Sequence, residues 1–381
     1  MTLNEIPDEM FMHICRYIAK DVTLAALKST CWRFHRLLED STFWRESRLT
    51  IHGVLKIGLV SRALSSAPCL RQLDLRDCLQ VTDEFLYHVM CRFPTIDDVD
   101  LTGCVLLTDN SMSVMRHCLH RLTSLSISRC HLITCYALVQ LVKRHGTTLK
   151  HLDLSNSVGL LKDRYRIAEI ADHLPNLTSL SVDWSSRYDR TLILDADLSR
   201  VALLCRKLQR LDSGSSHVHT SSIDSLATHC GDLRRLNLAN CFVRLADLAK
   251  LGCRLQRLDQ LNLSGCNSLS DAALEPSHHQ LYRLRHLNLS CCFYLESETC
   301  NEILVKLTQL REYMIRECFR VTERGLTAAL GHPALFYLDV SGTAVSREYV
   351  DTLRASSVTE CLTVVADRCP PHTRQKGITW T

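Results

Sequence analysis

One pattern recurs about every 26 residues from Leu70 onward, and it limits what this chain can fold into more than any other feature. A typical copy has an apolar residue, two variable residues, Leu-x-Leu or a similar apolar pair, two more variable residues and, in most copies, a cysteine. Residues 70–78, LRQLDLRDC, and residues 284–292, LRHLNLSCC, are two examples. A fixed period of this length is the signature of a solenoid, in which each repeat packs only on its neighbours. We therefore expect a repeat array that acts through surface recognition.

The local pattern predicts one strand and one helix in each copy. Apolar residues at the fourth and sixth positions alternate with polar ones, as in a short strand with one buried face. A Thr or Ser then precedes apolar residues at helical spacing, which predicts a helix N-cap. Such caps are expected at Thr82, Thr108, Thr134, Ser270 and Thr322. A strand, a turn and a helix in one period form a leucine-rich repeat, so the predicted fold class is α/β, with a parallel sheet inside and helices outside.

The repeat array has expected bounds. The copies begin at Leu70, Ile96, Leu122, Leu149, Leu177, Leu208, Leu233, Leu258, Leu284, Leu310 and Leu335, which gives about 11 copies over residues 70–357. Residues 46–69 are expected to form a degenerate N-terminal capping repeat, with Leu49 and Ile51 in the strand positions. Residues 358–381 are expected to contain a terminal strand near Leu362 to Val365 and a tail without periodicity.

The 20 cysteines are interpreted as packing residues. Many of them recur at the ninth repeat position, where a small side chain suits the turn after the strand and its S–H can approach a neighbouring carbonyl. The alternative, a metal site, has little support because the chain has no C-x-x-C. The adjacent Cys291 and Cys292 would also point in opposite directions on a strand. We therefore predict no metal and no cofactor.

Composition and motifs exclude several function classes. The net charge of +4 does not indicate nucleic-acid binding, and no apolar run approaches the ~18 residues that span a membrane. Charged residues follow the first methionine at once, without the apolar run of a secretory signal, so a cytoplasmic or nuclear location is expected. We find no phosphate-binding, dinucleotide-binding, serine-hydrolase or zinc-protease motif. The sequence therefore predicts no catalytic residue and a protein that is not an enzyme.

The residues before the repeats carry a second pattern. Residues 6–9 read Ile-Pro-Asp-Glu, residues 30–37 read TCWRFHRL, and residues 43–44 read Phe-Trp. Apolar residues between these motifs fall on helical stripes, and Pro7 with its acidic neighbours suits a helix start. At about 45 residues the segment is too short to bury a core by itself, so it needs a partner or a neighbouring domain.

This pattern resembles the F-box family, with mild departures at positions 6, 30 and 34. The resemblance implies a three-helix F-box at residues 1–45 and a substrate receptor of an SCF (Skp-cullin-F-box) ubiquitin ligase. Such a receptor binds a Skp-type adaptor, and through it a cullin and a RING subunit, and promotes ubiquitination and proteasomal degradation of a target protein. By the family pattern, the adaptor interface would include Ile6, Pro7, Met10, Ile14, Leu24, Leu27, Cys31 and Phe34. Two alternatives remain: an inert cap on the first repeat, and a leucine-rich-repeat scaffold or inhibitor outside the ubiquitin system.

The target would bind residues that vary between copies. Third and seventh strand positions point away from the buried face, and in the later copies they include His151, Arg210, Arg235, His286 and Arg316. These cations would suit an acidic or phosphorylated target, although a solvated charged face is the simpler explanation. The long fifth copy adds Trp184, Arg187 and Tyr188, which are side chains enriched at binding hot spots. The alternative for this insertion is a loop that covers its own repeat.

Overall fold

The computed structural model describes residue 8 and residues 31–37, 48–50, 70–161, 167–183, 194–216, 218–268, 281–356 and 362–368. The chain divides into two compact units, Met1–Val182 and Asp183–Thr381.

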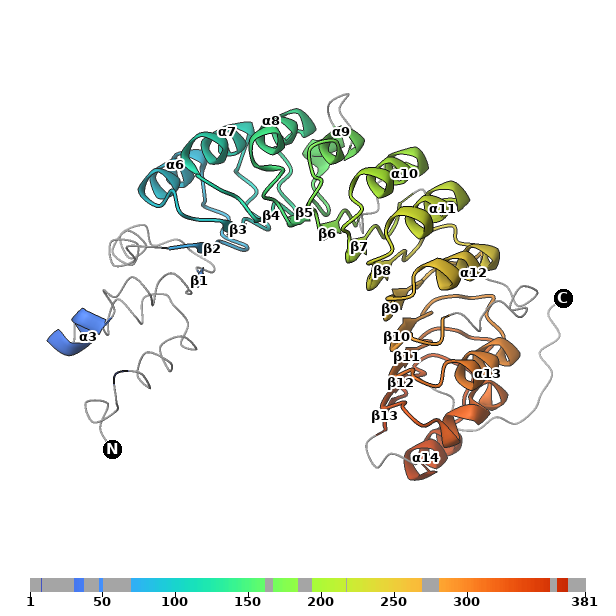
Figure 1. The fold of residues 1–381 in the computed structure, drawn as a ribbon. Helices are drawn as coiled ribbons and strands as arrows, with labels where there is room; N and C mark the ends of the chain where they lie inside the picture. The colour runs from blue at the N-terminus through green and yellow to red at the C-terminus, as the bar shows by residue number, and fades with distance from the viewer. Residues whose placement is uncertain are drawn as a thin grey trace. The chain divides into compact units, whose positions relative to one another are not determined.

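The first unit stacks parallel strands in sequence order, with helices along one side of the strands (Figure 1). Leu73 at the centre of one strand is in register with Leu49 of the strand before it and with Val99 of the strand after it. The elements are α3 (Trp32–Leu37), β1 (Arg48–Thr50), β2 (Gln72–Asp74), α6 (Asp83–Arg92), β3 (Asp98–Asp100), α7 (Asp109–Cys118), β4 (Ser124–Ser126), α8 (Cys135–His145), β5 (His151–Asp153), the 3-10 helix η2 (Val158–Leu161), α9 (Ile167–Ala171) and β6 (Ser179–Ser181).

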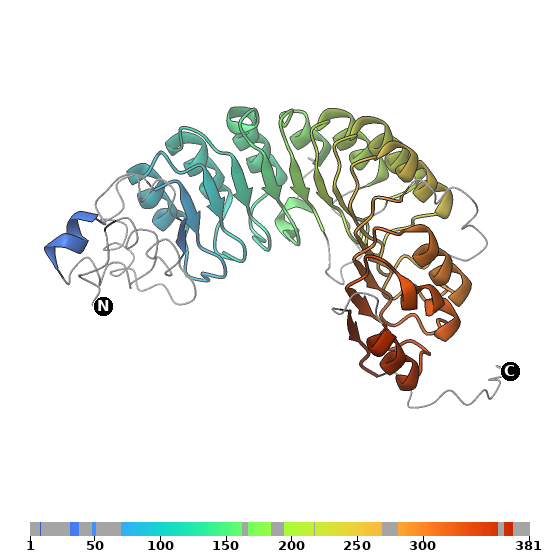
Figure 2. The same cartoon turned by 60° about the horizontal axis from the view of Figure 1, so that its bottom comes forward.

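The second unit repeats this arrangement, and its strands again pair in sequence order (Figure 2). Leu236, for example, is in register with Leu211 and Leu261 on the two flanking strands. The elements are α10 (Asp195–Leu204), β7 (Arg210–Asp212), α11 (Thr220–His229), β8 (Arg235–Asn237), α12 (Leu245–Arg254), β9 (Gln260–Asn262), β10 (His286–Asn288), α13 (Ser297–Lys306), β11 (Glu312–Met314), the 3-10 helix η5 (Glu323–Gly331), β12 (Tyr337–Asp339), α14 (Arg347–Ser356) and β13 (Thr363–Val365).

The predicted leucine-rich-repeat fold is confirmed. Each strand from β2 to β12 begins two residues after a predicted copy start, and β13 lies in the predicted terminal segment. The fourth and sixth positions are buried as expected, for example Leu73 and Leu75, which are 2% and 0% exposed. Most of the predicted three-helix F-box lies outside the described residues, and the domain boundaries at residues 45, 69 and 357 stay predictions.

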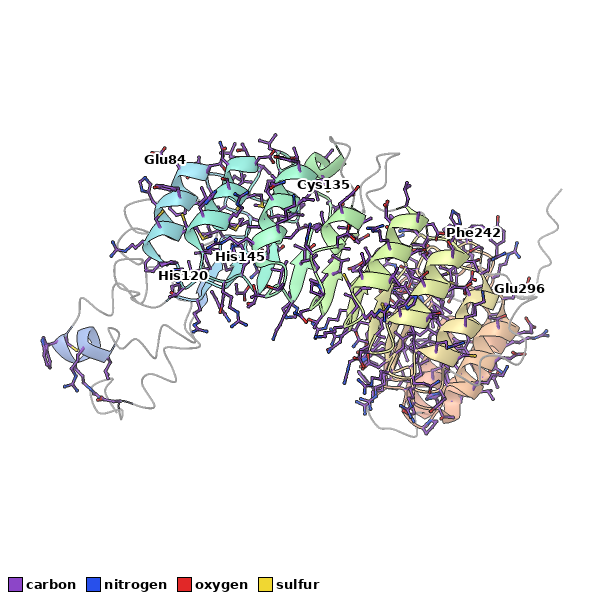
Figure 3. The ribbon with its side chains drawn as sticks, turned by 45° about the horizontal axis from the view of Figure 1, so that its top comes forward. Glu84, His120, Cys135, His145, Phe242 and Glu296 are labelled. Atoms are coloured by element: carbon purple, nitrogen blue, oxygen red, sulfur yellow. The ribbon has the colours of Figure 1, made fainter. Side chains whose placement is uncertain are left out.

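Helix starts follow the predicted caps in the first unit. The hydroxyls of Thr82, Thr108 and Thr134 accept hydrogen bonds from the backbone N–H of the first turn in α6, α7 and α8. Figure 3 shows Glu84 and Cys135 at the starts of α6 and α8, on the edge opposite His120 and His145. These helices therefore run in the same direction along the outside of the sheet.

The expected cap at Thr322 differs from the prediction. Thr322 precedes a 3-10 helix, η5, and its hydroxyl shares a hydrogen bond with the Ser297 hydroxyl at 3.0 Å instead of capping the first turn. The backbones approach closely here, because a Cβ at Gly325 would lie 3.0 Å from the Ser297 Cα and O atoms. The narrower 3-10 helix suits this approach. The fourth predicted cap, Ser270, lies outside the described residues.

The repeated cysteines occupy the packing role that the sequence predicts. The Cys104, Cys130 and Cys292 thiols are fully buried, and each donates to a strand carbonyl of the preceding repeat at 3.2 to 3.3 Å. Burial raises the pKa of Cys130 to about 12, so the thiol stays protonated at neutral pH. Cys291 differs from the strand geometry expected for it, because it lies in the turn after β10 with φ of 59°.

Candidate functional site

A short part of the N-terminal segment is described, and it joins two of the predicted motifs. The Arg33 guanidinium of α3 donates from Nε to the Asp8 carboxylate at 2.8 Å and from Nη2 at 2.5 Å. Arg36 approaches the same carboxylate at 4.0 Å. Because Asp8 belongs to the Ile-Pro-Asp-Glu motif, this ion pair ties the start of the segment to its Cys-Trp-Arg motif.

The same helix exposes an aromatic side chain that the sequence interpretation passed over. Trp32 is 74% exposed, and the Arg36 guanidinium lies 5.5 Å from its ring centre. Cys31, a predicted adaptor contact, is half-buried beside it. An exposed tryptophan between two motif residues is a signal for a binding surface, since Trp is enriched at hot spots. The other predicted adaptor contacts, Ile6, Pro7, Met10, Ile14, Leu24 and Leu27, and the side chain of Phe34 lie outside what the structure describes.

In the second unit, arginines gather where the strands begin. Arg210 and Arg235 are the first residues of β7 and β8, while Arg234, Arg285 and Arg311 directly precede β8, β10 and β11. All five side chains are exposed, and we call this set the basic edge. Within the described residues, the structure pairs none of the five with a carboxylate.

Register places two of these arginines side by side. Arg210 and Arg235 are partner residues on adjacent parallel strands, which lie about 4.8 Å apart. Like charges on adjacent strands repel each other, and salt screens this repulsion. An anion placed between the guanidinium groups would remove this repulsion and accept hydrogen bonds from both. The pair therefore has the chemistry of a carboxylate or phosphate site.

Cations beside the basic edge are partly matched by acids. Arg257 pairs with Asp232, and His286 Nδ1 lies 2.8 Å from Glu312 Oε2. Asp259 lies between the arginines of β8 and β10 and is half-buried. The predicted contact His286 thus has an acidic partner, whereas Arg210 and Arg235 face water.

The remaining predicted target contacts lie elsewhere. Arg316 follows the end of β11, at the opposite strand end from the basic edge, and approaches Glu317 at 3.9 Å. His151 is an exposed first residue of β5 in the other unit. The insertion residues Trp184, Arg187 and Tyr188 lie outside the described residues. The basic edge therefore includes two of the eight predicted target contacts, Arg210 and Arg235.

The corresponding edge of the first unit has a mixed charge. Asp97 and Asp98 stand at the start of β3, and Arg71 approaches Asp97 at 3.5 Å. Burial raises the pKa of Asp97, while Arg71 opposes that shift. Paired charges of this kind leave no surplus of positive charge, so the gathering of unpaired arginines among the described residues is a feature of the second unit.

Metal ligands and membrane-spanning helices were considered for the described residues. Among the described residues there is no group of three or more His, Cys, Asp or Glu side chains that could hold a metal ion. The same part of the chain has no helix that is long and apolar enough to cross a membrane.

Comparison with known families identifies the N-terminal segment. Residues 3–50 match the F-box-like family. The chain thus has an F-box-like segment at residues 3–50, followed by leucine-rich repeats. The predicted resemblance is confirmed at this level, because the match covers the motifs at residues 6–9 and 30–44 and the repeat fold follows it.

The chain is distantly similar to several known proteins. The DNA repair protein rhp7 of Schizosaccharomyces pombe is 27% identical over 140 residues, which span 37% of this chain and 23% of rhp7. Among solved structures, the yeast complex of Rad7 and Elc1 is similar with a TM-score of 0.56 and 14% identity, over 94% of this chain and 92% of the other. The internalin inlF from Listeria monocytogenes has a TM-score of 0.54 and 16% identity, over 92% and 96% of the two chains. These likenesses show the fold.

Proposed function

We propose that this protein is the substrate-recognition subunit of an SCF ubiquitin ligase. Its F-box-like residues would bind a Skp-type adaptor, and through it a cullin and a RING subunit. The repeats would bind a target protein and promote its ubiquitination and proteasomal degradation. The observation that carries this proposal is the F-box-like match at residues 3–50, directly before a leucine-rich-repeat array.

Such a receptor works by proximity and performs no chemistry of its own. An F-box followed by leucine-rich repeats is typical of adaptor and receptor proteins rather than of enzymes. Holding a target beside a ubiquitin-conjugating enzyme turns an encounter between two molecules into a reaction within one complex. The effective concentration then depends on the distance between the two tethered sites.

The named relatives support a partner-bound role. Rad7 was crystallised in a complex with Elc1, and its fold covers nearly the whole of this chain. The name of rhp7 places that relative in DNA repair, which supports a nuclear location for this protein beside a cytoplasmic one.

The basic edge supports an acidic or phosphorylated target. Arg210, Arg234 and Arg235 present neighbouring guanidinium groups, each of which can form a bidentate pair with a carboxylate or phosphate. Arginine is suited to this because its planar fork matches both anions. A segment that runs along the strand starts would contact several of these side chains in succession.

The adaptor interaction is tested by purification of the full-length chain co-expressed with a Skp-type adaptor. The double variant Ile6→Ala with Pro7→Ala is expected to lose the adaptor, while its circular dichroism spectrum stays that of a folded repeat array. A matched control, Leu79→Ala with Leu106→Ala, removes two exposed apolar side chains from the repeats and should retain the adaptor. Equal adaptor recovery with the first variant and the wild type would contradict the proposal, and a scaffold outside the ubiquitin system would then be favoured.

Target binding is tested by purifying the chain with its adaptor from cells in which the proteasome is inhibited. Proteins that accumulate only under inhibition are candidate targets. The charge reversal Arg210→Glu with Arg235→Glu is expected to reduce recovery of such targets by about tenfold, which corresponds to about 1.4 kcal/mol. Arg254→Glu with Arg324→Glu makes the same charge change at exposed helix positions and serves as the control. Unchanged recovery with the first pair would remove the basic edge as the target site, without affecting adaptor binding.

A further inference from the structure

Two thiols from adjacent repeats meet on the helix side of the first unit. Cys91 stands in the last turn of α6, and Cys118 is the last residue of α7. Their sulfur atoms lie 3.1 Å apart, in hydrogen-bonding contact. They are 27 positions apart in the sequence, which is about one repeat. The last turns of two neighbouring helices thus bring two cysteines together.

This pair differs from the packing cysteines in its access to solvent. Cys91 is exposed and Cys118 is half-buried, whereas Cys78 and Cys104 of the same repeats are fully buried. Buried packing thiols meet carbonyl oxygens, while Cys91 and Cys118 meet each other. Soluble reagents can therefore reach a sulfur that already has a second sulfur within contact.

We propose that Cys91 and Cys118 form an oxidisable dithiol, which hydrogen peroxide converts into a disulfide that links the first two full repeats. A disulfide needs the sulfur atoms to close to about 2.05 Å, a movement of about 1 Å. Rotation of the two side chains supplies such a movement without a change in the helices. The site lies apart from the basic edge and does not depend on the proposed ligase function.

The reaction balances in two steps. The Cys91 thiolate attacks one peroxide oxygen, the O–O bond breaks, and the leaving hydroxide takes a proton to give water and a sulfenic acid on Cys91. The Cys118 sulfur then attacks the Cys91 sulfur, the S–O bond breaks, and the leaving hydroxide takes the Cys118 thiol proton to give a second water. Two thiols are thus oxidised and one peroxide is reduced to two waters.

The exposure of the two cysteines indicates which thiol reacts first. Cys91 is the more exposed thiol and meets the peroxide first. Burial and the hydrogen bond with Cys91 raise the pKa of Cys118 to about 11, which keeps Cys118 protonated until its partner has reacted. Tyr87 lies one turn earlier on α6, and the nearby Cys91 thiol raises the pKa of Tyr87.

The test treats the full-length chain with hydrogen peroxide, blocks free thiols with iodoacetamide during denaturation and digests with trypsin. Cleavage after Arg76 and Arg92 releases residues 77–92, and cleavage after Arg116 and Arg121 releases residues 117–121. We expect these two peptides joined through Cys91 and Cys118, with Cys78 alkylated. Alkylation of Cys91 should fall by about tenfold after oxidation and return with a reducing agent.

Variants of single cysteines test whether both thiols are needed. Cys91→Ser and Cys118→Ser should each abolish the linked peptide, while Cys253→Ser, at an exposed cysteine of the second unit, should retain it. Because serine differs from cysteine by one atom, folding is checked in each variant by circular dichroism. Oxidation of wild-type Cys91 to a sulfinic acid, or a disulfide between two chains, would overturn the proposal, since either result shows that Cys118 does not resolve the oxidised thiol.

Discussion

The Asp109 carboxylate, in the first turn of α7, accepts hydrogen bonds from the next repeat. The Thr134 N–H donates to one carboxylate oxygen at 2.7 Å and the Thr134 hydroxyl donates to the other at 2.9 Å. Asp83 binds Thr108 in the same way one repeat earlier. Each aspartate therefore begins its own helix and also fixes the cap of the helix that follows, which links neighbouring repeats through their polar edge.

We predict that Asp109→Ala lowers the free energy of unfolding by about 2 kcal/mol, because hydrogen bonds to a charged group are among the stronger ones and Thr134 loses both. Chemical denaturation of the full-length chain measures this change. Glu84→Ala is the control, since Glu84 also lies in a first turn but its side chain is 87% exposed. Its expected cost is about 0.5 kcal/mol, from the helix dipole and an exposed contact with His88 at 3.9 Å. Equal losses in the two variants would show that the link between repeats contributes nothing.

This link shows where sequence reasoning stops. The 26-residue period was enough to predict every strand from β2 to β12, because a repeat must bury the same apolar positions in each copy. Thr134 was also predicted as a cap, since that signal is local. Asp109 would be assigned to its own helix by the same local rules, and only the stacked structure shows that it binds a residue 25 positions away.

Part of the basic edge was predictable from the repeat pattern. Arg210 and Arg235 could be identified from their shared repeat position. The pairing of His286 with Glu312 depends on the register of β10 and β11, so it becomes visible only when the copies are aligned as strands. The contact of Cys91 with Cys118 had no sequence signal, because these are two of the thirteen cysteines that lie outside the repeated ninth position.

The packing role of the repeated cysteine predicts which substitutions it tolerates. Ser157 occupies the position of Cys130 one repeat later, and its hydroxyl donates to the Ile127 carbonyl at 2.6 Å. We expect Cys130→Ser to cost less than about 1 kcal/mol, because serine keeps a donor of smaller size. Cys130→Val should cost about 2 kcal/mol, since it removes the donor and adds volume to a closed turn. Thermal and urea unfolding measure both variants. A valine variant as stable as the serine variant would refute the importance of this hydrogen bond.

The glycine in the turn before Cys104 leads to a second prediction about stability. Gly103 has φ of +75°, and a Cβ there would lie 2.5 Å from the Asp77 Oδ1 atom. Asp77 cannot withdraw freely because the Arg129 guanidinium binds the same oxygen. We expect Gly103→Ala to destabilise the chain by about 2 kcal/mol, through backbone strain and this contact. Gly231→Ala is the matched control, because nothing lies within 4 Å of a Cβ at that position. Its stability should change by no more than about 0.5 kcal/mol.

The buried His332 predicts a dependence of stability on pH. Its Nε2 lies 3.1 Å from the Leu307 carbonyl, while Nδ1 accepts hydrogen bonds from the backbone N–H groups of Ala334 and Leu335. An acceptor Nδ1 requires the neutral ring, and burial lowers the pKa of His332. The unfolded chain therefore binds a proton at a higher pH than the folded chain does. The stability from this residue is complete above the unfolded pKa of about 6.5 and is lost as the pH falls below it.

Unfolding free energies measured between about pH 7.5 and about pH 5.5 test this expectation. We predict that wild type loses more stability over this range than His332→Gln, whose amide can donate and accept but does not titrate. His120→Gln is the control, because His120 is exposed at the end of α7 (Figure 3) and its substitution should leave the pH dependence of the wild type unchanged. If His332→Gln has the same slope as the wild type, the neutral buried ring is not the source of the pH dependence, and the backbone contacts to Nδ1 do not determine its charge.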